Sequence, residues 1–293
     1  MKKSKPLGIR CGCAPMDVAM QRGPTPLVAA ALVDGSVALK RLEGEHAKAR
    51  SAHESLRLHE DSCRAVDFFP QSSSLITGGV DGSLRLGDVE TGKAVRTFSE
   101  AHEEGLTRVL ALDPHLFASG DEAGVVQRWD ARASSSLATA KIELHEHGVS
   151  DFKTLPGKHA LLSTGGDGTL AFVDSRTFKV RAKSEGGADD EFLAVETMRH
   201  GTKVVCGSGS GVLHIFSWGF WNDCSALYPG HPDAVESLIR LDDEALITGC
   251  SDGLIRVVSV VPNRMIGVLG SHKGGGVVKL ALSEDARWLA SAG

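Results

Sequence analysis

Histidine is the residue type whose number and spacing first suggest chemistry in this chain. The chain has 12 histidines, and a histidine beside a carboxylate and a hydroxyl can act as a general acid or base. Four histidines stand about 22 residues before a glycine: His59, His102, His145 and His231. Glycines of the same kind follow Asp34, Asp81, Asp167 and Asp252. Because His and Asp return at matching positions, we expect buried hydrogen-bond networks that hold each repeat together, with no catalytic role.

The other candidate motifs form no complete catalytic or metal-binding set. The glycine run 165–168 joins two apparent strands without a following Lys-Ser/Thr, which indicates a hairpin turn and not a phosphate-binding loop. Cys11 and Cys13 could be half of a zinc site, but no second Cys or His pair follows at zinc spacing. The acidic run 189–191 is typical of a solvated loop. We therefore predict a protein that is not an enzyme and holds no metal or cofactor.

The elements that must position these residues recur at a nearly fixed period. The turn glycines are Gly35, Gly82, Gly124, Gly168, Gly211 and Gly253, separated by 47, 42, 44, 43 and 42 residues. Between them lie short apolar runs joined by Gly and Asp, as in antiparallel strands with tight turns. One unit closes on Trp129-Asp130. A period of about 40–45 residues with His, Asp-Gly and Trp-Asp is the signature of WD repeats, each of which forms one propeller blade.

We predict an all-β fold, a WD-repeat β-propeller that is seven-bladed with the last blade truncated. The length of 293 residues fits one such domain over residues 1–293. The expected blades cover about 9–56, 58–100, 102–143, 145–185, 190–229, 231–270 and, as a partial unit, 272–293.

Composition limits the environment and the partners. The net charge of −5 argues against a surface that wraps nucleic acid as a whole. Two basic clusters leave a local RNA contact open beside the simpler interpretation as solvated surface: Lys2, Lys3, Lys5 and Arg10, and Lys40, Arg41, Lys48 and Arg50. The six cysteines are scattered, which fits a reducing compartment. No run of 18 apolar residues and no secretory signal is present, so we expect no membrane span.

Three irregularities distinguish individual repeats. Gly87 occupies the position of Trp129 in the second unit, which predicts weaker anchoring there. Residues 43–55 are polar and long, so we expect a loop or a poorly ordered outer strand. The last unit has only two apparent strands, and we predict that the segment 5–13 pairs beside it and closes the ring.

Several stretches are more specific than the general repeat. They are Asp88-Val89-Glu90-Thr91-Gly92, the run 203–208, Ser217-Trp218-Gly219-Phe220, Asp223-Cys224-Ser225 and Pro262-Asn263-Arg264. From about residue 16 to the end, the chain resembles the family of WD repeat-containing protein 55. The resemblance implies a non-enzymatic, nucleolar protein that is needed for ribosomal RNA production and ribosome assembly. It also implies protein partners and a monomer within a larger complex in the nucleus.

A second, local resemblance concerns partner binding. Trp129, Asp130 and Arg132 match the Trp-Asp-x-Arg box of WD proteins that dock on the adaptor of cullin-4 ubiquitin ligases, and Asp174 and Arg176 form a weaker copy. A substrate receptor of that ligase is therefore the alternative function. An exposed Arg132 could bind a carboxylate or carbonyl of the adaptor. Alternatively, it only pairs with Asp130 or with an acid of a neighbouring blade.

Overall fold

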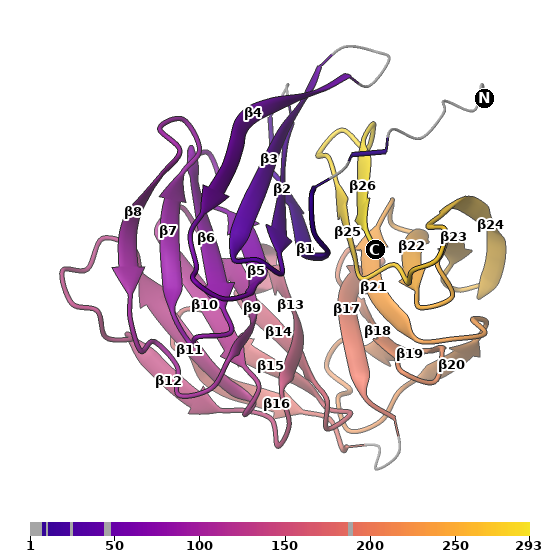
Figure 1. The fold of residues 1–293 in the computed structure, drawn as a ribbon. Helices are drawn as coiled ribbons and strands as arrows, with labels where there is room; N and C mark the ends of the chain where they lie inside the picture. Colours follow the sequence, from indigo (N-terminus) through magenta and orange to yellow (C-terminus); the bar gives the residue numbers. More distant parts are fainter. Residues whose placement is uncertain (1–7, 10, 24–25, 44–47, 187–189) are drawn as a thin grey trace.

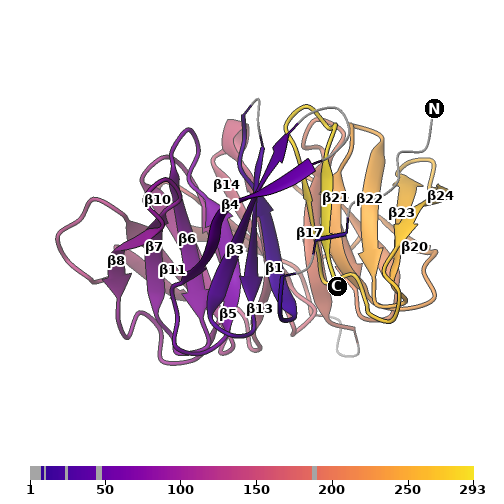
Figure 2. The same ribbon diagram turned by 45° about the horizontal axis from the view of Figure 1, so that its top comes forward.

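The computed structural model describes residues 8–9, 11–23, 26–43, 48–186 and 190–293, without the side chains of 43 and 48–54. These residues form six four-stranded antiparallel sheets and one two-stranded sheet, arranged as blades around a ring (Figure 1). In Figure 2 the strands run between two layers of loops. The all-β propeller architecture is confirmed, as six blades plus a partial sheet.

Each blade is a meander in which neighbouring strands follow one another in the sequence. Blade 1 contains β1 (Pro15–Met20), β2 (Leu27–Leu32), β3 (Ser36–Glu43) and β4 (Lys48–Arg57). Blade 2 contains β5 (Cys63–Phe68), β6 (Ser74–Gly79), β7 (Leu84–Asp88) and β8 (Lys93–Phe98). Blade 3 contains β9 (Leu106–Ala111), β10 (Leu116–Asp121), β11 (Val125–Asp130) and β12 (Ala140–Glu143).

The same order continues through the second half. Blade 4 contains β13 (Val149–Leu155), the 3-10 turn η1 (Pro156–Lys158), β14 (Ala160–Gly165), β15 (Leu170–Asp174) and β16 (Lys179–Lys183). Blade 5 contains β17 (Phe192–Met198), β18 (Lys203–Ser208), β19 (Val212–Ser217) and β20 (Ala226–Pro229). Blade 6 contains β21 (Val235–Arg240), β22 (Ala245–Cys250), β23 (Leu254–Ser259) and β24 (Arg264–Ser271). The partial blade 7 contains β25 (Lys279–Leu282) and β26 (Leu289–Ala292).

Several turn glycines contact the backbone of the histidine that opens the following unit of the chain. Gly124 has φ of +81°, and a Cβ there would lie 2.3 Å from the carbonyl oxygen of His145. The amide of His145 in turn donates to the carbonyl of Gly124 at 3.2 Å. Glycine is required here because the turn needs a left-handed backbone and leaves no room for a side chain. This contact ties the turn glycine of one unit to the histidine that opens the next.

The core consists of side chains packed between neighbouring blades. Between blades 2 and 3, Trp129 lies 5.3 Å from Phe98 and 6.2 Å from Phe117, measured between ring centroids. In blade 2 the equivalent space at Gly87 is taken by two leucines, since a Cβ on Gly87 would lie 3.2 Å from Leu75 and 3.3 Å from Leu58. Aliphatic side chains thus replace the missing indole.

The seam beside blade 7 is held by packed side chains on the blade 1 side and by a hydrogen bond on the blade 6 side. Figure 1 shows β25 and β26 between β1 and β21. A cluster that includes Val18, Val28, Ala281 and Ala292 joins blade 1 to this sheet. On the other side, the amide of Leu280 donates to the Ser237 hydroxyl at 3.0 Å. In the described residues, the two strands of blade 7 therefore contact both blade 1 and blade 6 without a third strand.

Two predictions concern blade 1 and the segment before it. For the closing segment 5–13, residues 5–7 and 10 lie outside the described residues, and the described remainder forms no strand. Instead of pairing with β26, Cys11 and Cys13 pack against Ala30, Leu32 and Ala38 of blade 1. The region 43–55 does contain an outer strand, because β4 pairs with β3 as far as Glu43↔Lys48.

Candidate docking face

The repeat histidines are bound within the blades, most completely in blade 3. His102 lies 2.7 Å from the Asp121 carboxylate through Nδ1 and 2.6 Å from the Ser119 hydroxyl through Nε2. Trp129 donates from Nε1 to the same Ser119 oxygen at 2.8 Å. His102, Ser119, Asp121 and Trp129 are all buried. The network joins β10 and β11 to the loop before β9 and leaves His102 no access to a substrate, so it acts structurally.

Related networks occupy blades 2 and 4. His59 Nε2 lies 2.8 Å from the Thr77 hydroxyl, and its Nδ1 lies 3.2 Å from Ser83, which donates to Asp81. His145 Nδ1 lies 3.3 Å from Asp167. The predicted pairing of His with the turn Asp is thus seen in both blades. It is direct between His145 and Asp167 in blade 4 and passes through Ser83 between His59 and Asp81 in blade 2.

The prediction is wrong for His231 in blade 6. Its Nε2 contacts the Thr248 hydroxyl at 2.9 Å, but its buried Nδ1 has no hydrogen-bond partner among the described residues. The turn carboxylate of Asp252 is held instead by the guanidinium of Arg256. Arg256 stands three residues after the turn glycine, where blade 3 has Gln127, and a cation at this position competes with histidine for the Asp.

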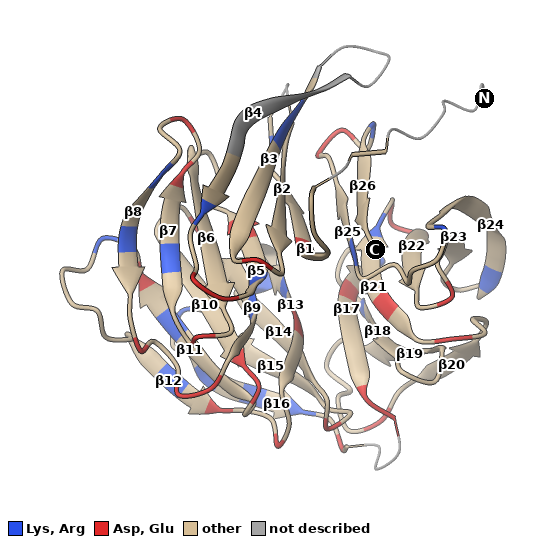
Figure 3. Ribbon diagram, in the orientation of Figure 1, with Lys and Arg blue, Asp and Glu red and all other residues tan. Residues whose placement is uncertain are grey.

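The two loop layers of the ring differ in charge. We call the layer formed by loops between first and second strands and between third and fourth strands the AB/CD face, and the other layer the opposite face. Loops of the opposite face contain one basic residue, Lys273, in the described part of the chain. The same loops expose many acids, which appear red in Figure 3: Glu60, Asp61, Glu100, Glu103, Glu104, Glu122, Glu146, Glu185, Glu191 and Asp233.

Arg132 lies on the AB/CD face, just after β11. Its side chain is 62% exposed, and its Nε and Nη2 donate to the two oxygens of Asp130 at 3.0 and 2.9 Å. This hydrogen bonding lowers the pKa of Asp130 to about 2, so the carboxylate stays ionised. The pair presents a positioned guanidinium to solvent, which combines both interpretations of Arg132: it pairs with Asp130 and remains accessible.

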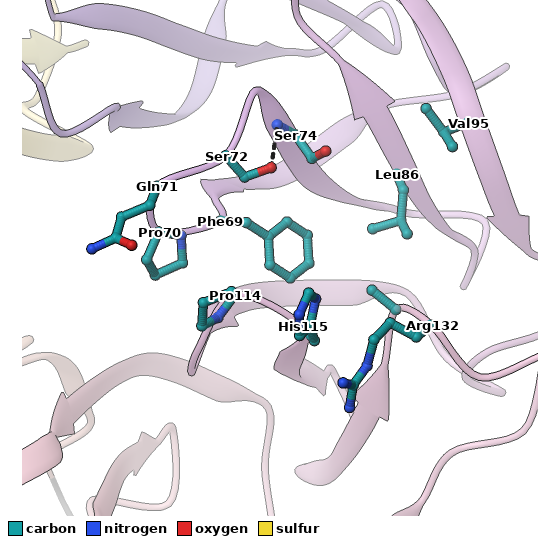
Figure 4. Close-up of a pocket in the computed structure, with 11 residues that line it drawn as sticks. Phe69, Pro70, Gln71, Ser72, Ser74, Leu86, Val95, Pro114, His115 and Arg132 are labelled. Atoms are coloured by element: carbon teal, nitrogen blue, oxygen red, sulfur yellow. Dashed lines mark hydrogen bonds between the residues drawn. The ribbon is translucent and has the colours of Figure 1, made fainter.

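A hollow of about 480 Å³ lies beside Arg132, between blades 2 and 3. Figure 4 shows Phe69 at its centre, with Pro114 and His115 on one side and Arg132 at the rim. Leu86 and Val95 add apolar surface, and Val95 is 66% exposed. We call this hollow, with its apolar floor and Arg132 at the rim, the groove. The sequence reasoning missed this groove, although Pro70 and Pro114 in equivalent loops were a usable signal.

The remaining predicted contact residues have different environments. Trp129 is only 2% exposed, so its ring is part of the core and cannot contact a partner directly. Asp174 pairs with Arg181 at 2.9 Å, while Arg176 gives only its backbone amide to that carboxylate. The hydrogen bond from the Thr177 amide and the one from Arg181 both lower the pKa of Asp174. The weaker copy of the motif therefore lacks the Asp–Arg pair of Asp130 and Arg132.

The two motifs are nevertheless neighbours. Arg128 on β11 donates from Nη1 to the carbonyl of Arg176 at 2.7 Å. Similarly, Arg96 of blade 2 donates to the carbonyls of Ala131 and Ser135 in the loop of Arg132. These arginine–carbonyl contacts fix adjacent loops of the AB/CD face, and the sequence pattern gave no signal for them.

The described residues contain neither a metal-binding cluster nor a helix that could span a membrane. There, no cluster of three or more His, Cys, Asp or Glu side chains has the arrangement of a metal site. In the same residues, no helix has the length and apolar character needed to span a membrane.

Comparison with known proteins covers nearly the whole chain. The WDR55 family model matches residues 6–293. WD repeat-containing protein 55 of Arabidopsis thaliana is 38% identical over 268 residues, which is 91% of this chain and 74% of that protein. The protein of the same name from Rattus norvegicus is 33% identical over 91% of this chain and 68% of its own length. WD repeat-containing protein JIP5 of Cryptococcus neoformans is 30% identical over 94% of this chain and 76% of its own.

Proposed function

Because the chain belongs to the WD repeat-containing protein 55 family, we propose that it is a non-enzymatic scaffold that binds proteins during ribosomal RNA production and ribosome assembly. The observation that carries the scaffold role is that the repeat histidines are bound inside the blades, while the AB/CD face presents a groove with a charged rim. We place the protein in the nucleolus, as a monomer within a larger complex. The ribosomal role and this location are supported by the family resemblance.

Depletion of the protein, followed by pulse-labelling of ribosomal RNA, tests the ribosomal role. The proposal expects precursors to accumulate and mature RNA to fall within the first hours, before growth slows. Re-expression of the chain should restore processing. Unchanged labelling after complete depletion would contradict the ribosomal role but would leave the fold and the docking face intact.

Docking on the cullin-4 ligase adaptor is the second candidate, and the geometry of Arg132 favours it. The guanidinium is exposed, is fixed by Asp130 and stands at the rim of an apolar groove. Such a group can make bidentate, charge-assisted hydrogen bonds to a partner. The two functions are compatible, since one face can serve different complexes.

A pull-down with purified adaptor separates this candidate from the first. We expect Arg132→Ala to weaken capture at least roughly tenfold, the loss of about 1.4 kcal/mol, which is typical of a charged hydrogen bond. Arg176→Ala is the matched control, because Arg176 makes no side-chain pair with Asp174. Equal capture of wild type and Arg132→Ala would exclude docking through this residue.

A further inference from the structure

Cations and an exposed aromatic ring gather on the AB/CD face where blades 4 and 5 meet. We call this surface the blade 4–5 patch, and it consists of Lys158, Arg176, Lys179, Lys203 and Phe220. Backbone hydrogen bonds join its loops within each blade, from the Ser175 amide to the His159 carbonyl at 2.8 Å and from the Trp218 amide to the Thr202 carbonyl at 2.9 Å, and Lys158 Nζ crosses to the Gly201 carbonyl at 2.6 Å. The patch is therefore one surface that spans two blades.

Two lysines of the patch are held by neutral groups, Lys158 across the boundary between blades 4 and 5 and Lys203 within blade 5. Lys158 donates from Nζ to the carbonyl of Gly201 at 2.6 Å and lies 3.8 Å above the centre of the Trp218 ring. Lys203 donates to the hydroxyls of Ser217 and Ser225 at 2.7 and 3.4 Å. Neutral partners fix a cation in place without cancelling its field.

The acids beside the patch are Asp174, Asp223 and Asp243, and Asp243 lies 2.7 Å from His200 and 3.5 Å from Arg240. Asp174 is neutralised by Arg181. Asp223 is exposed, and its carboxylate accepts a hydrogen bond from the amide of Cys224 at 2.7 Å. Arg176 and Lys179 are exposed beside Asp174. Positive charge thus dominates here although the whole chain carries −5.

Phe220 offers an aromatic surface that nothing in the described chain covers. It is 76% exposed. Its amide donates to the Ser217 carbonyl at 2.9 Å in a tight turn. The turn is anchored by Trp218 and Trp221, whose rings pack 5.0 Å apart. The ring is therefore held outward on a fixed turn beside the cations of the patch.

We propose that the blade 4–5 patch binds single-stranded RNA, with Lys158, Arg176, Lys179 and Lys203 against successive phosphates and Phe220 stacked on an unpaired base. A base presents its π-face only when it is unstacked, which favours a single strand over a duplex. The acidic opposite face repels the same chain and so orients it toward this side. The inference concerns the purified chain and does not depend on the ribosomal role.

Fluorescence anisotropy with a labelled RNA of about 12 nucleotides, within the range of single-strand sites, measures the binding. The double variant Arg176→Glu with Lys179→Glu should bind at least roughly tenfold more weakly at about 100 mM salt. The slope of the logarithm of the binding constant against the logarithm of the salt concentration, between about 50 and 200 mM, should also become shallower by about 1.4, because two phosphate contacts are lost. Lys141→Glu with Lys273→Glu is the control, because it changes the net charge equally at exposed positions outside the patch.

Substitution of Phe220 separates stacking from simple attraction. Phe220→Leu keeps an apolar side chain but removes the π-face, and we expect roughly tenfold weaker binding, while Phe220→Tyr should stay within about twofold of wild type. Because the ring is exposed, both variants should unfold at the wild-type urea concentration.

Each contrary outcome has a definite meaning. Equal losses in the patch variant and the control variant would show a general charge effect and overturn the proposal. Equal binding by Phe220→Leu and wild type would exclude base stacking. If a polyglutamate peptide competes as well as the RNA does, the surface is an acidic-protein site and the RNA assignment is wrong.

Discussion

Blades 3 and 6 both have the repeat histidine and an Asp near the turn, but the Asp comes from different positions: Asp121 ends β10 three residues before Gly124, whereas Asp252 directly precedes Gly253. In blade 3, Asp121 binds His102, and Trp129 completes the network through Ser119. In blade 6, Asp252 binds Arg256, and Nδ1 of His231 is left buried without a partner. Two features therefore differ together: the position of the Asp, and the residue three positions after the turn glycine, which is Gln127 in blade 3 and Arg256 in blade 6. Blade 2 lies between the two, since Arg85 lies 4.0 Å from Asp81 and His59 lies 3.5 Å from it.

The largest expected effect is the loss of the indole in blade 3. Trp129→Ala should lower the free energy of unfolding by about 3–5 kcal/mol, because a buried ring and its hydrogen bond to Ser119 are both removed. Urea unfolding measures this loss. A decrease below about 1 kcal/mol would mean that blade 3 is not held by its network.

A double-mutant cycle compares the two His–Asp pairs directly. Replacing His102 and Asp121 singly and together should give a coupling free energy of about 1–3 kcal/mol, because the two groups are in contact. The same cycle on His231 and Asp252 should give less than about 0.5 kcal/mol. Similar coupling in both blades would contradict the proposed diversion of Asp252 by Arg256.

Acidification should destabilise the fold through blades 2 and 6. Burial lowers the pKa of His59 and His231 to about 4, and Arg85 and Arg256 each contribute to the lowering. Between pH 6.5 and pH 4 the unfolded chain therefore binds more protons than the folded protein, so stability falls as the pH falls through this window. Burial raises the pKa of Asp67 to about 6, which acts in the opposite direction over the lower part of the range.

A variant isolates the contribution of His231. His231→Gln should lower the melting temperature more at pH 7.5 than at pH 5, because only the wild type carries the cost of protonating this histidine. Arg256→Gln should instead raise the pKa of His231 from about 4 toward its ordinary value of 6.5, measured by NMR titration. An unchanged pKa in Arg256→Gln would remove Arg256 from the explanation.

The smallest effect is expected where the sequence most suggested a defect. Gly87→Ala should change the free energy of unfolding by less than about 1 kcal/mol, since the new methyl meets only the mobile ends of Leu58 and Leu75. Gly87→Trp should destabilise by about 1–3 kcal/mol or more, because the space for an indole is already filled. If Gly87→Trp stabilised blade 2, the two leucines would not be the replacement that the structure indicates.

Much of the fold was predictable because the turn glycines and histidines touch each other. The contact of Gly124 with His145 leaves no room for a side chain at the turn, so the glycines mark each four-stranded blade in the sequence and their period predicted the blades. The pairing of Asp252 with Arg256 was harder to predict from the sequence, since an Arg in a strand is usually a solvated surface residue. The groove beside Arg132 was missed because Phe69 and His115 come together only when blades 2 and 3 pack. Likewise, the packing of Cys11 and Cys13 on blade 1 depends on a path that no local pattern specifies.

The central claim is that the AB/CD face, and not the acidic opposite face, carries the scaffold function. Cells depleted of the protein can be supplied with Arg132→Glu plus Arg176→Glu, or with the matched opposite-face variant Glu103→Lys plus Glu104→Lys. All four positions are exposed, so both variants should melt within about 2 °C of wild type. Pulse-labelled ribosomal RNA should stay defective with the AB/CD variant and recover with the opposite-face variant. Full recovery with the AB/CD variant would contradict the account.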